Sequence, residues 1–119
     1  MVFAGPPTLI PVGLEQLGGC VAPSLDAALE EADAVMVLRV QGERQTAGYV
    51  PSVREYARLY GLTAERAERL RPGVLVMHPG PINRGVELAP EVADGPANVI
   101  LAQVSHGVAV RMAILEACG

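Results

Sequence analysis

Short apolar runs alternate along the chain with segments whose apolar residues recur at helical spacing. The runs are too short for helices and predict buried strands at 2–4, 20–21, 34–38 and 74–77. The segments between them predict helices at 12–17, 25–32, 53–60, 64–70 and 98–118. Strands that alternate with helices are typical of an α/β fold with a doubly wound, mainly parallel sheet.

Hydroxyl side chains stand where several of these helices are expected to begin. Ser24, Ser52 and Thr63 can each accept a hydrogen bond from a free N–H group in the first helical turn. Ser52 is followed three residues later by Glu55, and this spacing predicts a capping box. Gly61 marks the expected end of the helix at 53–60.

The last helix, expected at 98–118, is apolar on more than one face. A helix on the surface of a globular protein shows a narrower apolar stripe, so this helix needs cover on two sides. Polar and charged residues interrupt it, and its charge-free stretch falls short of the ~20 residues that span a bilayer. We therefore expect it to pack against protein, with no membrane involved.

Composition narrows the class of function. The 119 residues limit the chain to one domain, and its net charge is −4 with no basic run and few aromatic residues, so no nucleic-acid partner is expected. Cys20 and Cys118 lie far apart without neighbouring ligands, which argues against a metal site or a redox pair. No G-x-G-x-x-G follows a strand, which argues against a nicotinamide dehydrogenase. No secretory pattern is present, so a cytoplasmic protein is expected. No metal and no cofactor are expected either.

The sequence His78-Pro79-Gly80-Pro81 follows the strand expected at 74–77. Proline fixes its backbone angle and has no N–H group, so two prolines around one glycine predict a stiff turn with carbonyl acceptors and few donors. At the carboxyl end of a parallel strand, such a turn can hold a small group that bears N–H hydrogens. An ordinary strand-to-loop turn has the same composition, and this segment alone does not separate the two.

Arg39 and Gln41 stand at the end of the strand expected at 34–38. Side chains alternate between the two faces of an extended chain, so these two point the same way. The planar guanidinium of arginine fits a carboxylate with two parallel hydrogen bonds, and glutamine adds a neutral donor or acceptor. The pair is suited to a small dicarboxylate. The open alternative is a surface arginine paired with Glu43 or another acid.

Together, the two segments resemble the carbamoyltransferase family, and within it the aspartate carbamoyltransferases. The resemblance is carried by residues 38–44 and 78–88, and it extends over nearly the whole chain through 3–9, 25–33, 103–104 and 107–113. Neither short motif is decisive alone, and their order, spacing and strand context make the match specific. The resemblance implies the Rossmann-like aspartate-binding domain of these enzymes.

The resemblance also implies a reaction: transfer of the carbamoyl group from carbamoyl phosphate to the amino group of L-aspartate, early in pyrimidine synthesis. By position, Arg39 and Gln41 would hold the side-chain carboxylate of aspartate, and the loop at 41–51 would close over it. The carbonyls of Pro79 and Gly80 would accept hydrogen bonds from the carbamoyl nitrogen. Pro81 would shape that turn, with a cis Gly80–Pro81 bond as one way to do so.

No catalytic residue is assigned from the sequence. His78 is a candidate general base, but its place just inside a strand end favours a buried, hydrogen-bonded structural role. Arg84 is expected to pair with Glu87 or another acid and to brace the turn at 79–81. The family uses no metal and forms no covalent enzyme intermediate, so the site is expected to act by orientation and charge stabilisation.

The chain is shorter than the two-domain subunits of the family, and it lacks their phosphate-binding Ser-Thr-Arg-Thr motif. Residues 1–119 therefore predict a partial aspartate-binding domain, truncated at its amino-terminal side, with 98–118 crossing to the missing carbamoyl-phosphate domain. A strand missing from the sheet leaves unpaired edges. We expect the isolated chain to be inactive, and its parent to be a homo-oligomer, a trimer in this family, with other pyrimidine-pathway subunits as further candidate partners.

Two alternatives stay open. An ornithine-type carbamoyltransferase shares the fold, but it is expected to carry a cysteine-bearing turn where 78–81 stands and to lack the Arg39-Val40-Gln41 pattern. A non-catalytic domain that serves as an assembly partner is suggested by the missing phosphate motif.

Overall fold

The computed structural model describes residues 1–41 and 52–119. Its strands form two parallel, two-stranded sheets that are not hydrogen-bonded to each other. In the first sheet, β1 (Val2–Phe3) pairs with β2 (Cys20–Val21), and in the second, β3 (Ala34–Met36) pairs with β4 (Leu75–Met77). The strands fall within the predicted ranges. The split into two sheets agrees with the expected unpaired edges.

Helices separate the strands, as the sequence predicted. The α-helices are α1 (Leu25–Leu29), α2 (Val53–Tyr60), α3 (Ala64–Glu68), α4 (Pro90–Ala93) and α5 (Ile100–Cys118). Two short 3₁₀ helices, η1 (Pro7–Leu9) and η2 (Leu14–Leu17), lie between β1 and β2. The sequence did not predict η1 or α4, and the helix expected at 12–17 is the shorter 3₁₀ segment η2. Both η1 and α4 begin at proline, whose fixed backbone angle suits a first helical position.

The predicted caps are present. The hydroxyl oxygen of Ser24 accepts a hydrogen bond from the N–H of Ala27, that of Ser52 from Glu55, and that of Thr63 from Arg66. Gly61 follows α2 where no larger residue fits, because a Cβ atom there would lie 2.5 Å from the carbonyl oxygen of Ala57 and 2.6 Å from that of Val86. These local signals position α1, α2 and α3.

Arg66 holds the first three helices together. Its guanidinium binds both carboxylate oxygens of Asp26 on α1, at 3.2 and 3.0 Å. The same side chain donates to the carbonyl of Gly61 at 2.7 Å, where α2 ends. Asp26 also pairs with Arg69. These bonds lower the pKa of the Asp26 carboxyl, with the hydrogen bond from Arg66 as the largest cause.

The core lies between β4, the segment after α2 and the segment around α4. Leu62, Val76 and Leu88 are its most deeply buried apolar residues, at 1, 0 and 0% exposure. Val76 also holds the segment before α5, because its N–H donates to Ala97 and its carbonyl accepts from Val99. In the same way, Leu62 is hydrogen-bonded to Glu87 and Ala89, which fixes the loop that follows β4.

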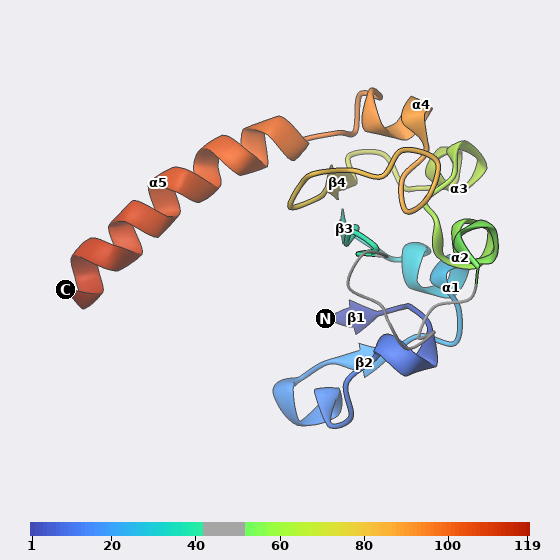
Figure 1. Cartoon of the computed structure of the whole chain (residues 1–119), viewed down its shortest axis with the longest axis horizontal. Coiled ribbons are helices and arrows are strands. Elements are labelled where there is room, and N and C mark those ends of the chain that lie inside the picture. Colours follow the sequence, from blue (N-terminus) through green and yellow to red (C-terminus); the bar gives the residue numbers. More distant parts are fainter. Residues whose placement is uncertain (42–51) are drawn as a thin grey trace.

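Helix α5 extends away from the rest of the chain, whereas α1, α2 and α3 gather near the strands (Figure 1). After Ile100 its residues are exposed except for Gln103, which is half-buried. The radius of gyration of 15.3 Å exceeds the ~13.5 Å expected of a compact domain of this length. The large apolar residues exposed on α5 are Leu101, Val104, Val108, Val110, Met112, Ile114 and Leu115.

The expectation that α5 packs against protein, with no membrane involved, stays a prediction. By length and composition alone, α5 is long and apolar enough to cross a membrane. Arg111 and Glu116 are its only fully charged residues, and both lie in its second half. One such helix is weak evidence for a membrane, because an apolar helix that packs against another domain has the same composition.

Candidate functional site

The parallel pairing of β3 and β4 brings the two sequence motifs to one edge. Met36 lies opposite Met77, and the N–H of Val37 donates to the carbonyl of Met77 at 2.9 Å. Strands β3 and β4 lie side by side (Figure 1), and because they are parallel, Arg39 and His78 follow them at the same edge. In α/β sheets, this carboxyl end of the strands is where ligands bind.

A side-chain hydrogen bond joins the two motifs beyond the strand ends. The amide Nδ2 of Asn83 donates to the carbonyl of Val40 at 2.9 Å. Val40 stands between Arg39 and Gln41, the two residues proposed for carboxylate binding, and all three are half-buried. The bond therefore holds the segment 39–41 against the loop that follows β4. The suggested pairing of Arg39 with Glu43 and the lid at 41–51 fall on residues 42–51, outside the described residues.

The turn at 79–81 has the cis bond that the sequence left open. The Gly80–Pro81 bond is cis, and Gly80 has a φ of +71°, a conformation that favours glycine. Pro79, Gly80 and Pro81 are exposed. Within the described residues, no backbone N–H donates to the carbonyl of Pro79 or Gly80. The turn therefore presents acceptors at the same edge as Arg39 and Gln41.

His78 is fully buried, at 0% exposure, directly before this turn. Its Nδ1 accepts a hydrogen bond from the N–H of Gly80 at 2.9 Å, and its own N–H donates to the Oε1 atom of Gln103 on α5 at 3.0 Å. Because Nδ1 acts as an acceptor, the neutral ring carries its proton on Nε2. The ring thus has no free basic lone pair, which agrees with the structural role that the sequence favoured.

Glu87 is the second fully buried ionisable residue, also at 0% exposure. Its Oε1 atom accepts a hydrogen bond from the backbone N–H of Asn83 at 2.6 Å and lies 3.3 Å from Nε2 of His78. Burial and the nearby Glu87 carboxylate raise the pKa of Tyr56, with burial as the larger cause. Sequence analysis predicts for Glu87 only a candidate pairing with Arg84.

Arg84 pairs with a different acid. Its guanidinium donates to both carboxylate oxygens of Asp94, at 2.7 and 2.8 Å, and not to Glu87. This hydrogen-bonded pair raises the pKa of Arg84 and lowers the pKa of Asp94. The pair is exposed and fixes the start of the loop relative to the end of α4. The reason is burial, because Glu87 points into the protein while Arg84 stays in solvent.

Sequence reasoning missed the contacts made by three residues, Asn83, Glu87 and Gln103. Asn83 and Gln103 lie inside segments that the family resemblance included, but their partners are distant in sequence. Glu87 carried the clearest signal, since a carboxylate between Val86 and Leu88 in an apolar stretch is unusual unless it is paired.

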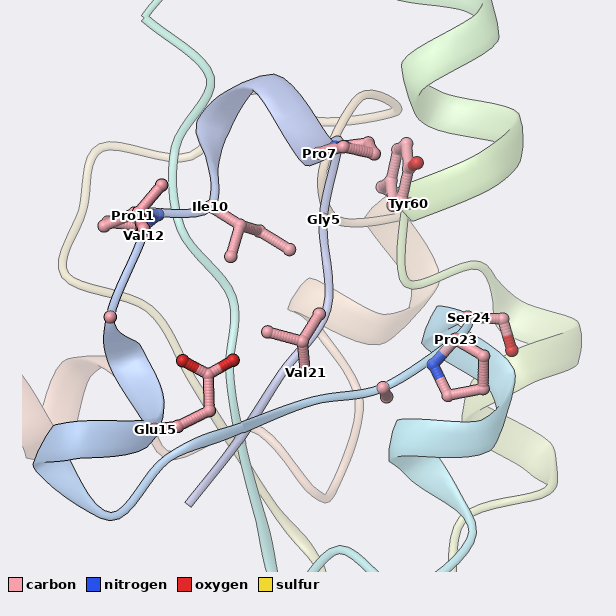
Figure 2. A pocket seen from close by; sticks show the side chains of 12 residues that line it. Gly5, Pro7, Ile10, Pro11, Val12, Glu15, Val21, Pro23, Ser24 and Tyr60 are labelled. Carbon is pink, nitrogen blue, oxygen red and sulfur yellow. The ribbon is translucent and has the colours of Figure 1, made fainter.

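A separate cleft of about 420 Å³ lies near the first sheet. Figure 2 shows Ile10, Val21, Pro23 and Tyr60 around it, with Glu15 contributed by η2. Among the described residues that line it, Glu15 is the only charged one. The predicted site residues Arg39, Gln41 and 79–81 are not part of this described lining.

The chain is similar to known proteins over nearly its whole length. Residues 18–118 match the family "Aspartate/ornithine carbamoyltransferase, Asp/Orn binding domain". The chain is 68% identical over 118 residues to the aspartate carbamoyltransferase catalytic subunit of Myxococcus xanthus, which covers 99% of the chain and 40% of the relative. For the corresponding subunit of Desulfosudis oleivorans, identity is 59% and coverage is 96% and 37%. The chain thus spans about two fifths of the length of these relatives.

Solved structures give the same result. Aspartate transcarbamoylase from Trypanosoma cruzi in complex with carbamoyl phosphate has a TM-score of 0.77 at 26% identity, covering 96% of this chain and 38% of that one. Ornithine carbamoyltransferase from Thermus thermophilus has a TM-score of 0.70 at 20% identity, covering 87% and 34%, which shows the shared fold alone. The chain therefore belongs to the aspartate/ornithine carbamoyltransferase family, through its Asp/Orn-binding domain.

Proposed function

We propose that the chain is the aspartate-binding part of an aspartate carbamoyltransferase catalytic subunit. The relatives at 59–68% identity carry that name. Structures of the Trypanosoma cruzi enzyme contain carbamoyl phosphate with aspartate, and carbamoyl aspartate with phosphate. The whole protein would transfer a carbamoyl group from carbamoyl phosphate to L-aspartate.

The hydrogen bond between Asn83 and Val40 carries this proposal. It holds the segment 39–41, which is suited to a dicarboxylate, close to the loop that contains the turn at 79–81, which is suited to an N–H-bearing group. Aspartate offers the carboxylate and carbamoyl phosphate offers the amide nitrogen. A site built for both substrates requires these two segments to be adjacent.

Each residue has a role in the proposed reaction. Arg39 and Gln41 hold the side-chain carboxylate of aspartate through charge-assisted and neutral hydrogen bonds. The carbonyls of Pro79 and Gly80 accept hydrogen bonds from the carbamoyl nitrogen, and Pro81 keeps that turn in shape. The free amine of aspartate then attacks the carbamoyl carbon, a C–N bond forms, and the C–O bond to phosphate breaks. The amine loses a proton as phosphate leaves.

These residues contribute orientation rather than covalent chemistry. Holding the amine against the carbamoyl carbon converts a bimolecular reaction into one within a single complex. The groups that bind the phosphate are proposed to lie in a carbamoyl-phosphate domain outside this chain. The exposed apolar surface of α5 supports docking of this helix on that domain. We further propose a cytoplasmic homotrimer that acts in pyrimidine synthesis.

A chimera tests the function directly. This chain replaces the matching 118 residues of the Myxococcus xanthus subunit, and the product is here named the chimera. The chimera is expected to form carbamoyl aspartate from aspartate and to leave ornithine unreacted, whereas the isolated chain is expected to form none. Preference for ornithine would favour the ornithine-type alternative. A folded chimera that turns over neither amino acid would favour the non-catalytic alternative and refute the proposal.

A further inference from the structure

Glu87 contacts both halves of the proposed site from inside the protein. Its carboxylate is removed from solvent, although an ionised group is costly to bury unless other groups compensate it. Oε1 receives the N–H of Asn83 at 2.6 Å and lies 3.3 Å from Nε2 of His78. Oε2 is buried with no hydrogen-bond partner among the described residues. A buried acid in this position can hold the groups around it in place.

One contact leads from Glu87 to the carbamoyl turn. The N–H of Gly80 occupies Nδ1 of His78, so the ring proton is on Nε2, the nitrogen that faces Glu87. A carboxylate beside Nε2 favours this tautomer. The other tautomer would place a proton on Nδ1, where it would meet the N–H of Gly80. Glu87 thus fixes the ring state that allows His78 to hold Gly80.

The other contact leads from Glu87 to the aspartate segment. The backbone N–H of Asn83 donates to Glu87, and the side chain of the same residue donates to the carbonyl of Val40. The orientation of Asn83 therefore depends on both partners, the Glu87 carboxylate and the Val40 carbonyl. Glu87 itself is anchored, because its carbonyl accepts the N–H of Leu62 in the core at 2.9 Å.

We propose that Glu87 is a positioning residue that couples the carbamoyl-binding turn, through His78, to the aspartate-binding segment, through Asn83. This inference rests on the proposed function, since it gives the two segments their substrates. Glu87 touches neither substrate. Its effect is to hold the loop that follows β3 and the loop that follows β4 at one fixed separation.

Kinetics of the chimera test the coupling. Glu87→Leu removes the acceptor for the backbone N–H of Asn83 and the carboxylate that lies 3.3 Å from Nε2 of His78, and Glu87→Gln retains a neutral oxygen. We expect Glu87→Leu to lower kcat/KM on the order of 10²-fold, because a small misplacement of the reacting groups has an effect of that size. Glu87→Gln should lower kcat/KM less. Val92→Ala is the matched control, because Val92 is a core residue at 6% exposure outside this network. It should lower the melting temperature without changing kcat/KM beyond twofold or so.

A double-mutant cycle separates positioning from general destabilisation. If Glu87 acts on aspartate through Asn83, then Glu87→Leu raises the KM for aspartate less in an Asn83→Ala background than in the wild type. Val92→Ala should combine additively with Asn83→Ala. Additive effects of Glu87→Leu and Asn83→Ala, or a kcat/KM in Glu87→Gln and Glu87→Leu equal to that of Val92→Ala, would overturn the coupling while leaving the proposed function intact.

Nuclear magnetic resonance of this chain gives a readout independent of turnover. The chain has two histidines, and His106 on exposed α5 serves as the internal reference. His78 should show the neutral tautomer protonated on Nε2, and Glu87→Leu or Glu87→Gln should lower the population of that tautomer while the signal of His106 stays unchanged. A wild-type His78 protonated on Nδ1 would overturn the inference. An inactive wild-type chimera would instead refute the proposed function, and the tautomer would still decide the role of Glu87.

Discussion

Asn83→Ala removes the one side-chain hydrogen bond described between the two motifs. The backbone N–H of residue 83 remains, so its bond to Glu87 is retained and the turn at 79–81 keeps its support. Only the bond from Nδ2 to the carbonyl of Val40 is lost. The expected effect is therefore confined to the segment that carries Arg39 and Gln41.

The magnitude follows from the chemistry of that bond. It is a neutral hydrogen bond of 2.9 Å between half-buried groups. Such bonds contribute roughly 0.5–1.5 kcal/mol, and 1.4 kcal/mol is tenfold in a binding constant. If the bond is used to hold the segment in its binding position, the KM for aspartate in the chimera rises about two- to tenfold. The KM for carbamoyl phosphate should stay within about twofold, because no group near the turn is removed.

Initial rates with each substrate varied in turn are the assay, and Asn98→Ala is the control. Asn98 makes two hydrogen bonds of its own, donating to Ala93 and accepting from Ile100 at the start of α5, far from residues 39–41 in sequence. Loss of these neutral hydrogen bonds should cost about 1 kcal/mol of stability without raising the KM for aspartate. An unchanged KM for aspartate in Asn83→Ala would refute the reasoning that this bond positions the segment.

Three further predictions follow from particular residues. Arg39→Lys in the chimera should weaken aspartate binding on the order of 10²-fold, because two charge-assisted hydrogen bonds of roughly 1.5–3 kcal/mol each are reduced to a point charge; calorimetry that finds wild-type affinity would contradict the assigned role. Gly61→Ala should destabilise the chain by about 1–3 kcal/mol, because the added Cβ meets two carbonyl oxygens. Gly107→Ala, in open space on α5, should stabilise it by up to about 1 kcal/mol. Urea unfolding measures both free energies, and equal effects would be evidence against the packing described. The folded pKa of Asp26 lies below its usual 3.8, so its stabilising effect is full above that pH and is lost as the pH falls through the lowered value. Asp26→Asn should therefore flatten the acid dependence of unfolding below about pH 4, and an unaltered acid profile would refute the pairing with Arg66.

The sequence was most informative where structure depends on near neighbours. Ser24, Ser52 and Thr63 cap their helices because a hydroxyl reaches an N–H group three residues away, whatever the rest of the fold does. Helix α4 was missed because it has a single turn, and burial of Val92 and Ala93 stabilises it rather than a repeating pattern. The strand ends were shorter than predicted because the apolar runs continue past the last paired residue.

For the candidate site too, some features could be predicted from the sequence and others could not. Parallel strands place their carboxyl ends together, so the proximity of 39–41 and 78–81 could be predicted from two apolar runs and two motifs. The contacts that join them could not be predicted, because Asn83 and Val40 are 43 residues apart and no periodic pattern relates them. The burial of Glu87 likewise depends on the packing of Leu62 and Leu88, which only the folded chain brings together.

A crystal structure of the chimera with N-(phosphonacetyl)-L-aspartic acid, a ligand already seen in the Trypanosoma cruzi enzyme, tests the site most directly. The geometry described predicts the Arg39 guanidinium on the side-chain carboxylate of the aspartyl group, with the turn at 79–81 lining the same crevice. A bound ligand with Arg39 directed to the opposite face of the sheet, and with no ligand contact from that turn, would contradict the shared site.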